Sequence, residues 1–249
     1  MSTLTDKTAL VTGATSGIGL AAARKLAAEG AHVFLTGRRQ AALDDAVAAI
    51  GPRATAIRAD VADAADLERM AATIREHGAG LDVVFANAGG GEFAALGGIT
   101  WEHYADTFNT NVGGTLFTVQ TVLPLLNRGA SIILTSSNID VKGAASFSVY
   151  AASKAALRSF ARSWSAELVG RGIRVNSIAP GPIATPGLSG LAPDPEAAEQ
   201  LLKGPASGVP MDRLGTPDEI ADAVVFLASA TSSYMTGAEI YVDGGASQV

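Results

Sequence analysis

Three side chains in the middle of the sequence have types and spacing that suit proton transfer. Tyr150 and Lys154 are four residues apart, so on a helix they lie on one face with their Cβ atoms about 5–6 Å apart. Ser137 ends an apolar segment that precedes this pair. A free tyrosine has a pKa near 10, and a neighbouring ammonium group lowers that pKa because it favours the phenolate. We therefore expect Lys154 to tune Tyr150 as a general acid or base, and Ser137 to hydrogen-bond a substrate oxygen.

The elements that must position these residues alternate between apolar strands and alanine-rich helices. The predicted strands cover residues 8–11, 32–35, 55–58, 81–85, 132–134, 173–178 and 239–242. The predicted helices cover about residues 17–29, 41–50, 64–77, 101–111 and 150–169. This order indicates an α/β fold: a single Rossmann-type doubly wound domain over residues 1–249, whose seven-stranded parallel sheet is flanked by helices on both faces. Such a sheet binds ligands at the carboxyl ends of its strands, and Ser137 follows a strand end.

A glycine-rich turn, Thr-Gly-Ala-Thr-Ser-Gly-Ile-Gly, follows the first predicted strand over residues 12–19. Gly13 permits a tight turn, Gly17 a close approach of the backbone to a pyrophosphate, and Gly19 close packing of the helix on the sheet. The helix N-terminus would hold the phosphates, and Thr15 and Ser16 add hydroxyl donors. A glycine-rich turn also fits a plain tight connection, but its place after the first strand favours a dinucleotide cradle.

The end of the second strand carries Gly37, Arg38 and Arg39. Dinucleotide folds place here either an acid that binds the adenosine ribose or an arginine that accommodates a 2′-phosphate. Because the arginines stand where the acid would be, we predict that NADP(H) is preferred over NAD(H). The alternative is that both arginines begin a solvated helix.

Two later strand ends carry further candidate contacts. Asp60 can accept a hydrogen bond from an adenine amino group, and Val61 can pack on the adenine ring. Asp60 equally suits the N-cap of the next helix, and the residues alone leave both readings open. The segment Asn87-Ala88-Gly89 follows the fourth strand.

Composition narrows the class of protein. The net charge of −6 argues against nonspecific nucleic-acid binding, and the absence of cysteine excludes disulfides and thiolate metal sites. No signal peptide or membrane-spanning segment is recognisable, so we expect a cytoplasmic protein without a membrane partner. The proline-rich segment at about residues 185–210 is predicted to be a substrate lid, with a plain surface loop as the alternative.

Taken jointly, these motifs resemble the compact, single-domain form of the short-chain dehydrogenase/reductase superfamily over essentially the whole chain. The matching segments are residues 12–19, 60–61, 87–89, 109–112, 150–154, 180–185, 213–220 and 242–245. The resemblance implies an oxidoreductase that interconverts a carbonyl and an alcohol by hydride transfer. It implies that the catalytic residues are Asn111, Ser137, Tyr150 and Lys154, and that no metal takes part.

The resemblance also implies a role for each catalytic residue. Tyr150 would be the general acid/base, while Lys154 would lower its pKa and bind the nicotinamide ribose. Ser137 would orient the substrate, and Asn111 would bend its helix and hold a water that links Lys154 to a proton relay. Motifs and resemblance together predict these cofactor-binding residues: Gly13, Thr15, Ser16, Gly17, Ile18, Gly19, Arg38, Arg39, Asp60, Val61, Asn87, Ala88, Gly89, Tyr150, Lys154, Pro180, Gly181, Ile183 and Thr185.

Substrate and assembly are less constrained by the sequence. The predicted pocket wall consists of Phe93, Asn138, Asp140, Ala144, Phe147, Leu188 and Met211, which leaves steroids, sugars, acyl thioesters and simple ketones open. The resemblance implies a homotetramer, or a dimer, with the helix after Tyr150 at one interface. That helix carries an apolar stripe, which also fits plain core packing; it consists of Leu157, Phe160, Ala161, Trp164 and Leu168.

Two other functions use the same motifs. A non-catalytic NADP(H)-sensing or regulatory protein needs the cradle but not the acid–base pair, so the complete set of catalytic residues argues against it. A sugar-nucleotide epimerase or dehydratase uses a similar tyrosine–lysine pair. Those enzymes normally carry a substantial C-terminal substrate region, whereas only a short tail follows the last predicted strand.

Overall fold

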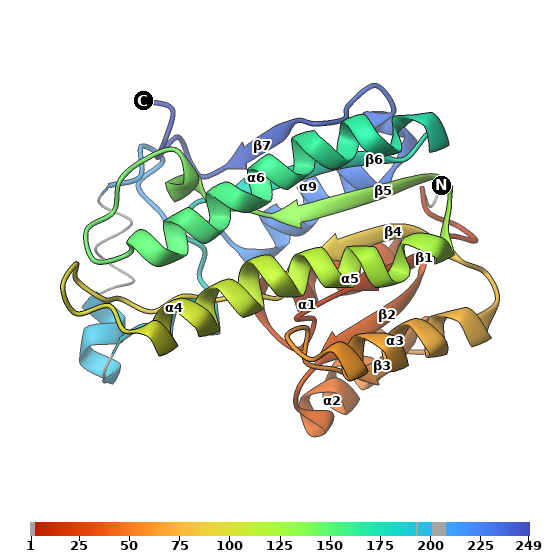
Figure 1. Cartoon of the computed structure of the whole chain (residues 1–249), viewed down its shortest axis with the longest axis horizontal. Coiled ribbons are helices and arrows are strands. Elements are labelled where there is room, and N and C mark those ends of the chain that lie inside the picture. Colours follow the sequence, from red (N-terminus) through yellow and green to blue (C-terminus); the bar gives the residue numbers. More distant parts are fainter. Residues whose placement is uncertain (1–2, 193, 201–207) are drawn as a thin grey trace.

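A seven-stranded, fully parallel sheet forms the centre of the molecule (Figure 1). The structure is a computed structural model that describes residues 3–192, 194–200 and 208–249. The strand order is β3-β2-β1-β4-β5-β6-β7, which has the reversal beside the first strand that marks a doubly wound fold. The strands are β1 (Thr8–Val11), β2 (His32–Gly37), β3 (Ala54–Arg58), β4 (Leu81–Ala86), β5 (Leu126–Thr135), β6 (Arg174–Pro180) and β7 (Glu239–Val242).

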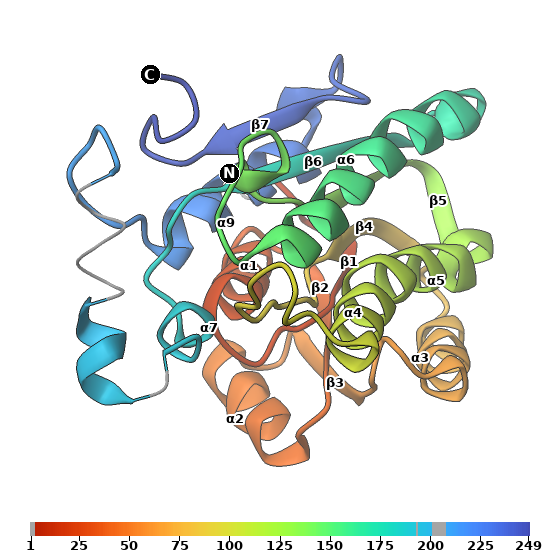
Figure 2. The same ribbon diagram turned by 60° about the vertical axis from the view of Figure 1, so that its left-hand side comes forward.

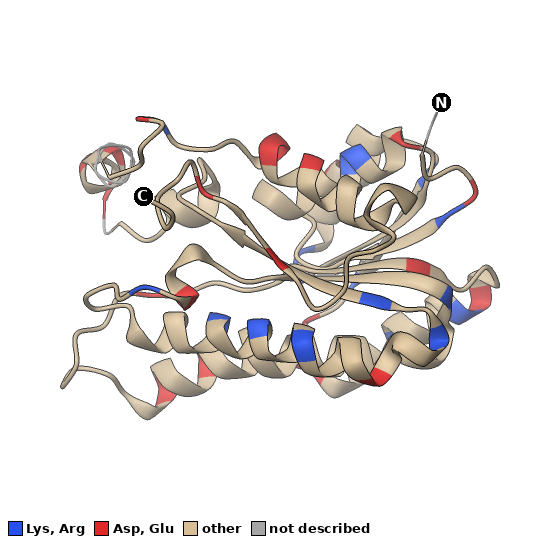
Figure 3. Ribbon diagram, turned by 90° about the horizontal axis from the view of Figure 1, so that it is seen from above, with Lys and Arg blue, Asp and Glu red and all other residues tan. Residues whose placement is uncertain are grey.

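Helices cover both faces of the sheet, which Figure 3 shows nearly edge-on between two helical layers. One layer contains α1 (Gly17–Ala28), α2 (Gln40–Ile50) and α9 (Pro217–Ala228). The other contains α3 (Ala64–His77), α4 (Trp101–Phe108), α5 (Gly114–Val122) and α6 (Ser148–Leu168). Acidic and basic residues are interspersed over both layers (Figure 3).

Each face of the sheet has its own apolar core, because neighbouring strand residues point to opposite faces. In β1, Val11 packs with α1 and α9, whereas Leu10 packs with α3 and α6. In β4, Phe85 and Val84 divide in the same way, and all four side chains are fully buried. The continuous apolar strands of the sequence are explained by this double-sided burial.

The carboxyl ends of the strands share one edge of the sheet. In Figure 1 the arrowheads of β4, β5 and β7 point to the left, where the loops that follow β4, β5 and β6 gather; Figure 2 turns this edge forward. Short elements lie in or near these loops: the 3₁₀ turn η3 (Asn138–Asp140) after β5, and α7 (Pro186–Ser189) after β6. The predicted chemistry therefore falls on the edge where doubly wound sheets bind ligands.

Two helices were not predicted from the sequence pattern. Helix α5 has the sequence Gly-Thr-Leu-Phe-Thr-Val-Gln-Thr-Val, whose β-branched residues are more typical of strands. It continues α4 through a π-helical turn, η1 (Asn109–Gly113). Helix α9 begins with a capping box in which Thr216 and Glu219 satisfy each other's backbone N–H groups, and that signal was present in the sequence.

The remaining short elements are the 3₁₀ turns η2 (Leu123–Leu125), η4 (Val169–Arg171) and η5 (Ala230–Ser232). The predicted lid is only partly visible, because residues 193 and 201–207 lie outside the described residues. Its described part contains α7 and a helical stretch at residues 195–200. Among the described residues, none of the helices has both the length and the apolar character to cross a bilayer.

Candidate active site

Two adjoining cavities open along the carboxyl edge of the sheet. Their volumes are about 770 Å³ and about 810 Å³, and they share Gly13, Ser16 and the loop at residues 89–92. Every catalytic and cofactor-binding residue predicted from the sequence lines one or both of them. The first cavity holds the ends of β2 and β3, and the second holds Ser137, Tyr150 and Lys154. Their combined size is compatible with a dinucleotide and a small substrate.

The glycine-rich turn is shaped as a cradle that side chains would fill. Gly13 has φ +63°, and a Cβ added to it would lie 2.9 Å from the Cα of Ala88. Gly17 has φ +53°, and its Cβ would lie 3.2 Å from Cγ2 of Thr185. The backbone of the β1–α1 turn therefore lies close to the loops after β4 and β6, with the N-terminus of α1 at the cavity. This arrangement fits the pyrophosphate of a dinucleotide.

Asn87 ties three strand ends together beneath this cradle. Its side-chain amide donates to the carbonyl oxygen of Thr12 at 3.0 Å, and its backbone N–H donates to the hydroxyl of Thr12 at 3.0 Å. The hydroxyl of Thr135, at the end of β5, donates to Asn87 Oδ1 at 3.4 Å. Asn87 therefore fixes the floor of the cavity.

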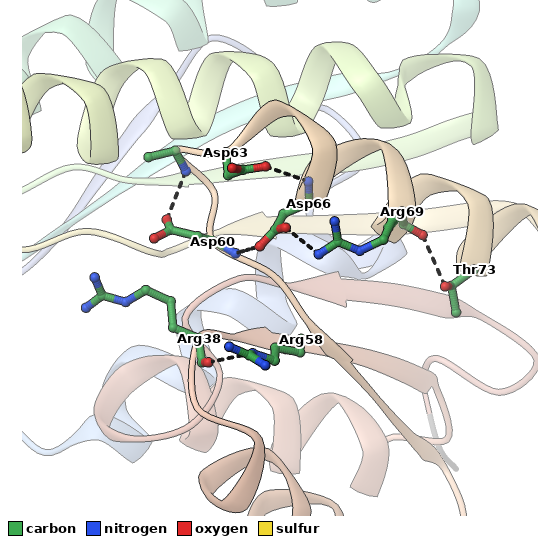
Figure 4. A network of polar contacts seen from close by, with 8 residues as sticks. Arg38, Arg58, Asp60, Asp63, Asp66, Arg69 and Thr73 are labelled. Atoms are coloured by element: carbon green, nitrogen blue, oxygen red, sulfur yellow. Dashed lines mark hydrogen bonds and ion pairs between the residues drawn. The ribbon is translucent and has the colours of Figure 1, made fainter.

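The adenosine end of the first cavity has a rigid backbone. Asp60 accepts a hydrogen bond from Ala62 N–H, while the N-cap of α3 is Asp63, so the alternative that Asp60 caps this helix is wrong. The carboxylate of Asp66 accepts the Asp60 N–H at 2.7 Å. Figure 4 shows this network, in which the Arg38 side chain extends away from the backbone.

Arg58 was not predicted to belong to the site. Its Nε donates to the carbonyl oxygen of Arg38 at 3.2 Å, which ties the end of β3 to the turn after β2 (Figure 4). Two arginines, Arg38 and Arg39, line the cavity, and Arg58 supports the backbone of the first. The pairing of Gly37 with Arg58 in the β2–β3 register explains why the two come together.

The first turn of α6 brings Tyr150 to the second cavity. Its hydroxyl is hydrogen-bonded to Ser137. The Phe147 ring stacks on the Tyr150 ring with their centroids 4.5 Å apart. Gly91, on the loop after β4, lies against the Tyr150 ring. The two hydroxyl groups thus meet at one point of the cavity, as a pair that binds a single substrate oxygen must do.

Lys154 lies one helical turn further along and is buried. Its ammonium group donates to the carbonyl oxygen of Thr135 at 2.7 Å and is 5.5 Å from the centroid of the Tyr150 ring. Asn111, in the π-helical turn η1, exchanges two hydrogen bonds with the backbone of Gly90, at 2.8 and 3.0 Å. It also donates to the Ser153 hydroxyl at 2.9 Å. Three of the four predicted catalytic residues therefore line the second cavity, whereas Asn111 lines the first and is joined to the Tyr150 backbone through Ser153.

Burial shifts the pKa values of Tyr150 and Lys154. It raises the pKa of Tyr150 to about 12, although the hydrogen bond with Ser137 acts in the opposite direction. Burial also lowers the pKa of Lys154 to about 8. The prediction that Lys154 brings the Tyr150 pKa below its ordinary value is wrong for this arrangement, because the loss of hydration around a phenolate decides the direction. At pH 7 Tyr150 is a neutral phenol and Lys154 is mostly a cation.

The predicted substrate wall is correct in part. Phe93, Asn138, Phe147 and Leu188 line the second cavity. Three further predicted wall residues, Asp140, Ala144 and Met211, are not among the residues that line it. The Asp140 carboxylate instead accepts hydrogen bonds from the hydroxyl groups of Ser136 and Tyr241, so it faces β7.

Several lining or supporting residues of the second cavity were missed, and three of them carry side chains that bear on the site. Glu92 and Leu191 line it, and Ser153 bridges Asn111 to the backbone carbonyl of Tyr150. A signal for Ser153 was available, because it lies three residues after Tyr150 on the same helix face. The apolar stripe of α6 is largely core: Leu157, Ala161 and Leu168 are buried.

Comparison with known proteins agrees with this arrangement. A family model described as enoyl-(acyl carrier protein) reductase matches residues 13–247. An oxidoreductase, asL5, of Sarocladium schorii is 46% identical over 248 residues, which cover 99% of this chain and 98% of the relative. An L-rhamnose 1-dehydrogenase (NAD(P)(+)) of Azotobacter vinelandii is 40% identical over 252 residues, covering 97% of each chain. The crystal structure of a levodione reductase superposes with a TM-score of 0.93 at 31% identity and covers 98% of each chain.

The chain belongs to the short-chain dehydrogenase/reductase superfamily. It is an oxidoreductase of that type, and the family uses nicotinamide cofactors.

Proposed function

We propose that the protein is an NADP(H)-dependent carbonyl reductase that converts a ketone to a secondary alcohol, with Tyr150 as the proton donor. The observation that carries this proposal is the hydrogen bond between the Tyr150 and Ser137 hydroxyls in the cavity, with the buried ammonium of Lys154 behind the ring. Two hydroxyl donors that converge on one point suit the single oxygen of a carbonyl better than a carbon–carbon double bond, which has no acceptor atom.

The protonation states favour the reductive direction. A reduced nicotinamide, when bound, supplies the hydride that the carbonyl carbon gains. As the carbonyl oxygen becomes an alkoxide, Ser137 stabilises its charge through a hydrogen bond, and Tyr150, a neutral phenol at pH 7, gives it a proton. The Lys154 cation then stabilises the phenolate that remains, and Asn111 holds the backbone beside them through Gly90. The reverse reaction, alcohol oxidation, needs the phenolate first and should be favoured at higher pH.

The cofactor proposal rests on the arginines beside the first cavity. Arg38 and Arg39 line it where a 2′-phosphate would lie, and the neighbouring Gly37 contributes no carboxylate. Because a hydrogen bond to a charged partner contributes about 1.5–3 kcal/mol, Arg38→Ala should weaken NADPH binding by roughly ten- to a hundred-fold. NADH binding should change little, and the exposed Arg53→Ala is the matched control. Equal losses for both cofactors would contradict the proposed role of Arg38.

The direct test of the function is consumption of NADPH and NADH with a panel of ketones. We expect turnover with NADPH at a higher kcat/KM than with NADH. If NADPH binds but none of the ketones is reduced, and the corresponding alcohols are not oxidised, the non-catalytic sensing function is favoured instead.

We further propose that the protein assembles as a homotetramer, or a dimer, and acts in the cytoplasm on a small molecule without a nucleic-acid or membrane partner. The support for assembly is apolar surface on the helices α4 and α5, where Trp101 is 86% exposed and Phe117 is 50% exposed. Contact with another chain would remove these apolar side chains from water.

A further inference from the structure

An aromatic ladder leads from the catalytic phenol to the mouth of the second cavity. The Phe147 ring stacks on Tyr150, with their centroids 4.5 Å apart and their planes at 22°. The Phe93 ring then lies against Phe147, with their centroids 4.6 Å apart. Phe93 is 48% exposed, so the outer end of the ladder faces solvent. All three rings line the cavity.

The two loops that carry this ladder are bound to each other. The backbone N–H of Ala94 donates to the carbonyl oxygen of Ser146 at 2.7 Å, which joins the loop after β4 to the segment before α6. Phe93 and Phe147 are direct neighbours of these two residues, so this hydrogen bond holds their backbones together. The three rings therefore form one wall of the cavity, on two loops that are hydrogen-bonded to each other.

The rest of the cavity wall near Tyr150 is mixed, with apolar side chains beside polar ones. Ile139, Leu188 and Leu191 line it from the loops after β5 and β6. The polar side chains that accompany them from the end of β5 and its loop are Thr135, Ser136, Ser137 and Asn138, all buried. Ser137 is already engaged with the reacting oxygen, which leaves Asn138 for one further hydrogen bond.

The charges at this cavity disfavour anions. Among its described lining residues, Lys154 is the one cation and Glu92 is the one anion. The Lys154 ammonium is buried and bonded to Thr135, whereas Glu92 is exposed at the rim. Among the described lining residues, a carboxylate or phosphate on the substrate would therefore meet the Glu92 carboxylate, while the Lys154 ammonium is already bonded to the backbone.

Polyhydroxy substrates fit this wall poorly as well. Each hydroxyl group that leaves water without finding a partner carries a desolvation penalty, and the apolar side chains of the wall offer no partners. A flat ring, in contrast, gains both burial and stacking against the ladder. We propose that the substrate is a neutral ketone whose carbonyl is attached to an aromatic or otherwise flat cyclic hydrocarbon group that packs against Phe93, the exposed ring of the ladder. This inference rests on the proposed function and narrows its substrate.

The test compares α-tetralone with fructose as ketone substrates, with NADPH, for the full chain and two variants. Phe93→Ala removes the outer ring, and Leu96→Ala is the matched control, because Leu96 is 92% exposed on the same loop and does not line the cavity. We expect a kcat/KM at least about a hundred-fold higher for α-tetralone. We expect Phe93→Ala to raise its KM about three- to ten-fold with kcat nearly unchanged, as the loss of one aromatic contact predicts. Leu96→Ala should change neither value.

A binding measurement separates this inference from the proposed function. Benzamide, an unreactive aryl carbonyl compound, is titrated calorimetrically into each protein, and Phe93→Ala should weaken its binding by the same factor. A preference for fructose, or equal effects of the two variants, would overturn the substrate class while leaving the reductase function intact. Benzamide binding that depends on Phe93, together with no turnover of either ketone or of the wider panel, would support the aromatic site and overturn the reductase function.

Discussion

Gly91 leaves space for the Tyr150 ring because it has no side chain. A Cβ built on it would lie 2.5 Å from Cδ2 and 2.7 Å from Cγ of Tyr150. These are distances that only a shift of the ring or of the loop can relieve. Gly143 is a suitable comparison, because it lines neither cavity and a Cβ on it meets no atom of the described residues within 4 Å.

We predict that Gly91→Ala lowers kcat/KM for ketone reduction by at least about ten-fold, because small displacements of a proton donor have large effects on rate. Gly143→Ala should stay within about two-fold of the parent. Steady-state kinetics of both variants, with circular dichroism as a check on folding, make the comparison. Equal activities of the two variants would show that contact with Gly91 does not position Tyr150.

Lys154 gives a pH-dependent prediction for stability. Its pKa is about 8 in the folded protein and near 10.5 when unfolded, so between these pH values the unfolded chain binds more protons. The free energy of unfolding must therefore rise with pH across this window, relative to a variant without the amine. The shift corresponds to about 3 kcal/mol at most, at about 1.4 kcal/mol for each unit.

Lys154→Met isolates this effect, since all other ionisations are common to the two proteins. We predict that the stability of the parent minus that of Lys154→Met rises by up to about 3 kcal/mol between pH 7 and pH 10.5. Urea unfolding at both pH values measures it. A difference that stays constant with pH would mean that Lys154 is not desolvated in the folded state.

At the residue scale, the position of a side chain in the site could be predicted where it and a second residue of the same motif are separated by a fixed number of residues. Tyr150 and Lys154 share a helix, and the glycines of the first turn have their own spacing, so their places were predictable. Gly91 and Arg58 act through contacts between segments far apart in the chain. The direction of the Tyr150 pKa depends on burial by Phe147 and its surroundings, which spacing does not reveal.

At the scale of the element, the π-helical turn η1 between α4 and α5 places Asn111 at the site. The resemblance implied a bend here, and the wider turn lets the Asn111 side chain reach the backbone of Gly90. Helix α5, which follows this turn, was not predicted because its β-branched composition is typical of strands. Its identity is set by packing against β4 and α3, which the local sequence does not encode.

Strand β7 contacts η3 through the Tyr241 hydroxyl, which lies between the carboxylates of Glu239 and Asp140. The Tyr241 hydroxyl donates to Glu239 at 3.0 Å and to Asp140 at 3.4 Å, while Arg158 pairs with Glu239 at 2.9 Å. Burial and then repulsion by Glu239 raise the pKa of Asp140 to about 6. Asp140 was predicted to face substrate, and this cluster explains why it turns away.

We predict that Asp140→Asn stabilises the protein at pH 7.5 by about 1 kcal/mol, a value reduced because the carboxyl group keeps contact with solvent. Between pH 3.8 and about 6 the folded state binds more protons at Asp140, so wild-type stability falls as pH rises through this window. The advantage of the variant should therefore vanish near pH 4. Urea unfolding at both pH values measures this stability difference, and the exposed Asp45→Asn is the control. A stability gain of Asp140→Asn that did not depend on pH would contradict the account.

At the scale of the whole molecule, the alternation of apolar strands and helices was enough to predict the sheet, its parallel sense and the edge that carries the site. Both faces of strands such as β1 and β4 are buried, and this leaves a strong pattern. Exposed apolar residues give a weaker sequence pattern. Trp101 and Phe117 look like core residues in the sequence, although they face solvent.

These exposed residues give a prediction about assembly. We expect sedimentation at micromolar concentration to show a species of about 100 kDa, four chains of 25.1 kDa, and Trp101→Glu to reduce its size. A dimer would agree with the alternative in the proposal, which names a homotetramer or a dimer. A 25.1 kDa monomer would leave the apolar surface of α4 and α5 without the proposed explanation.

The central claim is that the Tyr150 hydroxyl gives the proton that accompanies hydride transfer, and Tyr150→Phe removes that proton and little else. The measurement is the single-turnover rate of ketone reduction by NADPH, alongside the Kd for NADPH. The account predicts a rate about a hundred- to ten-thousand-fold lower, with NADPH binding within about three-fold of the parent. A rate within ten-fold of the parent would contradict it.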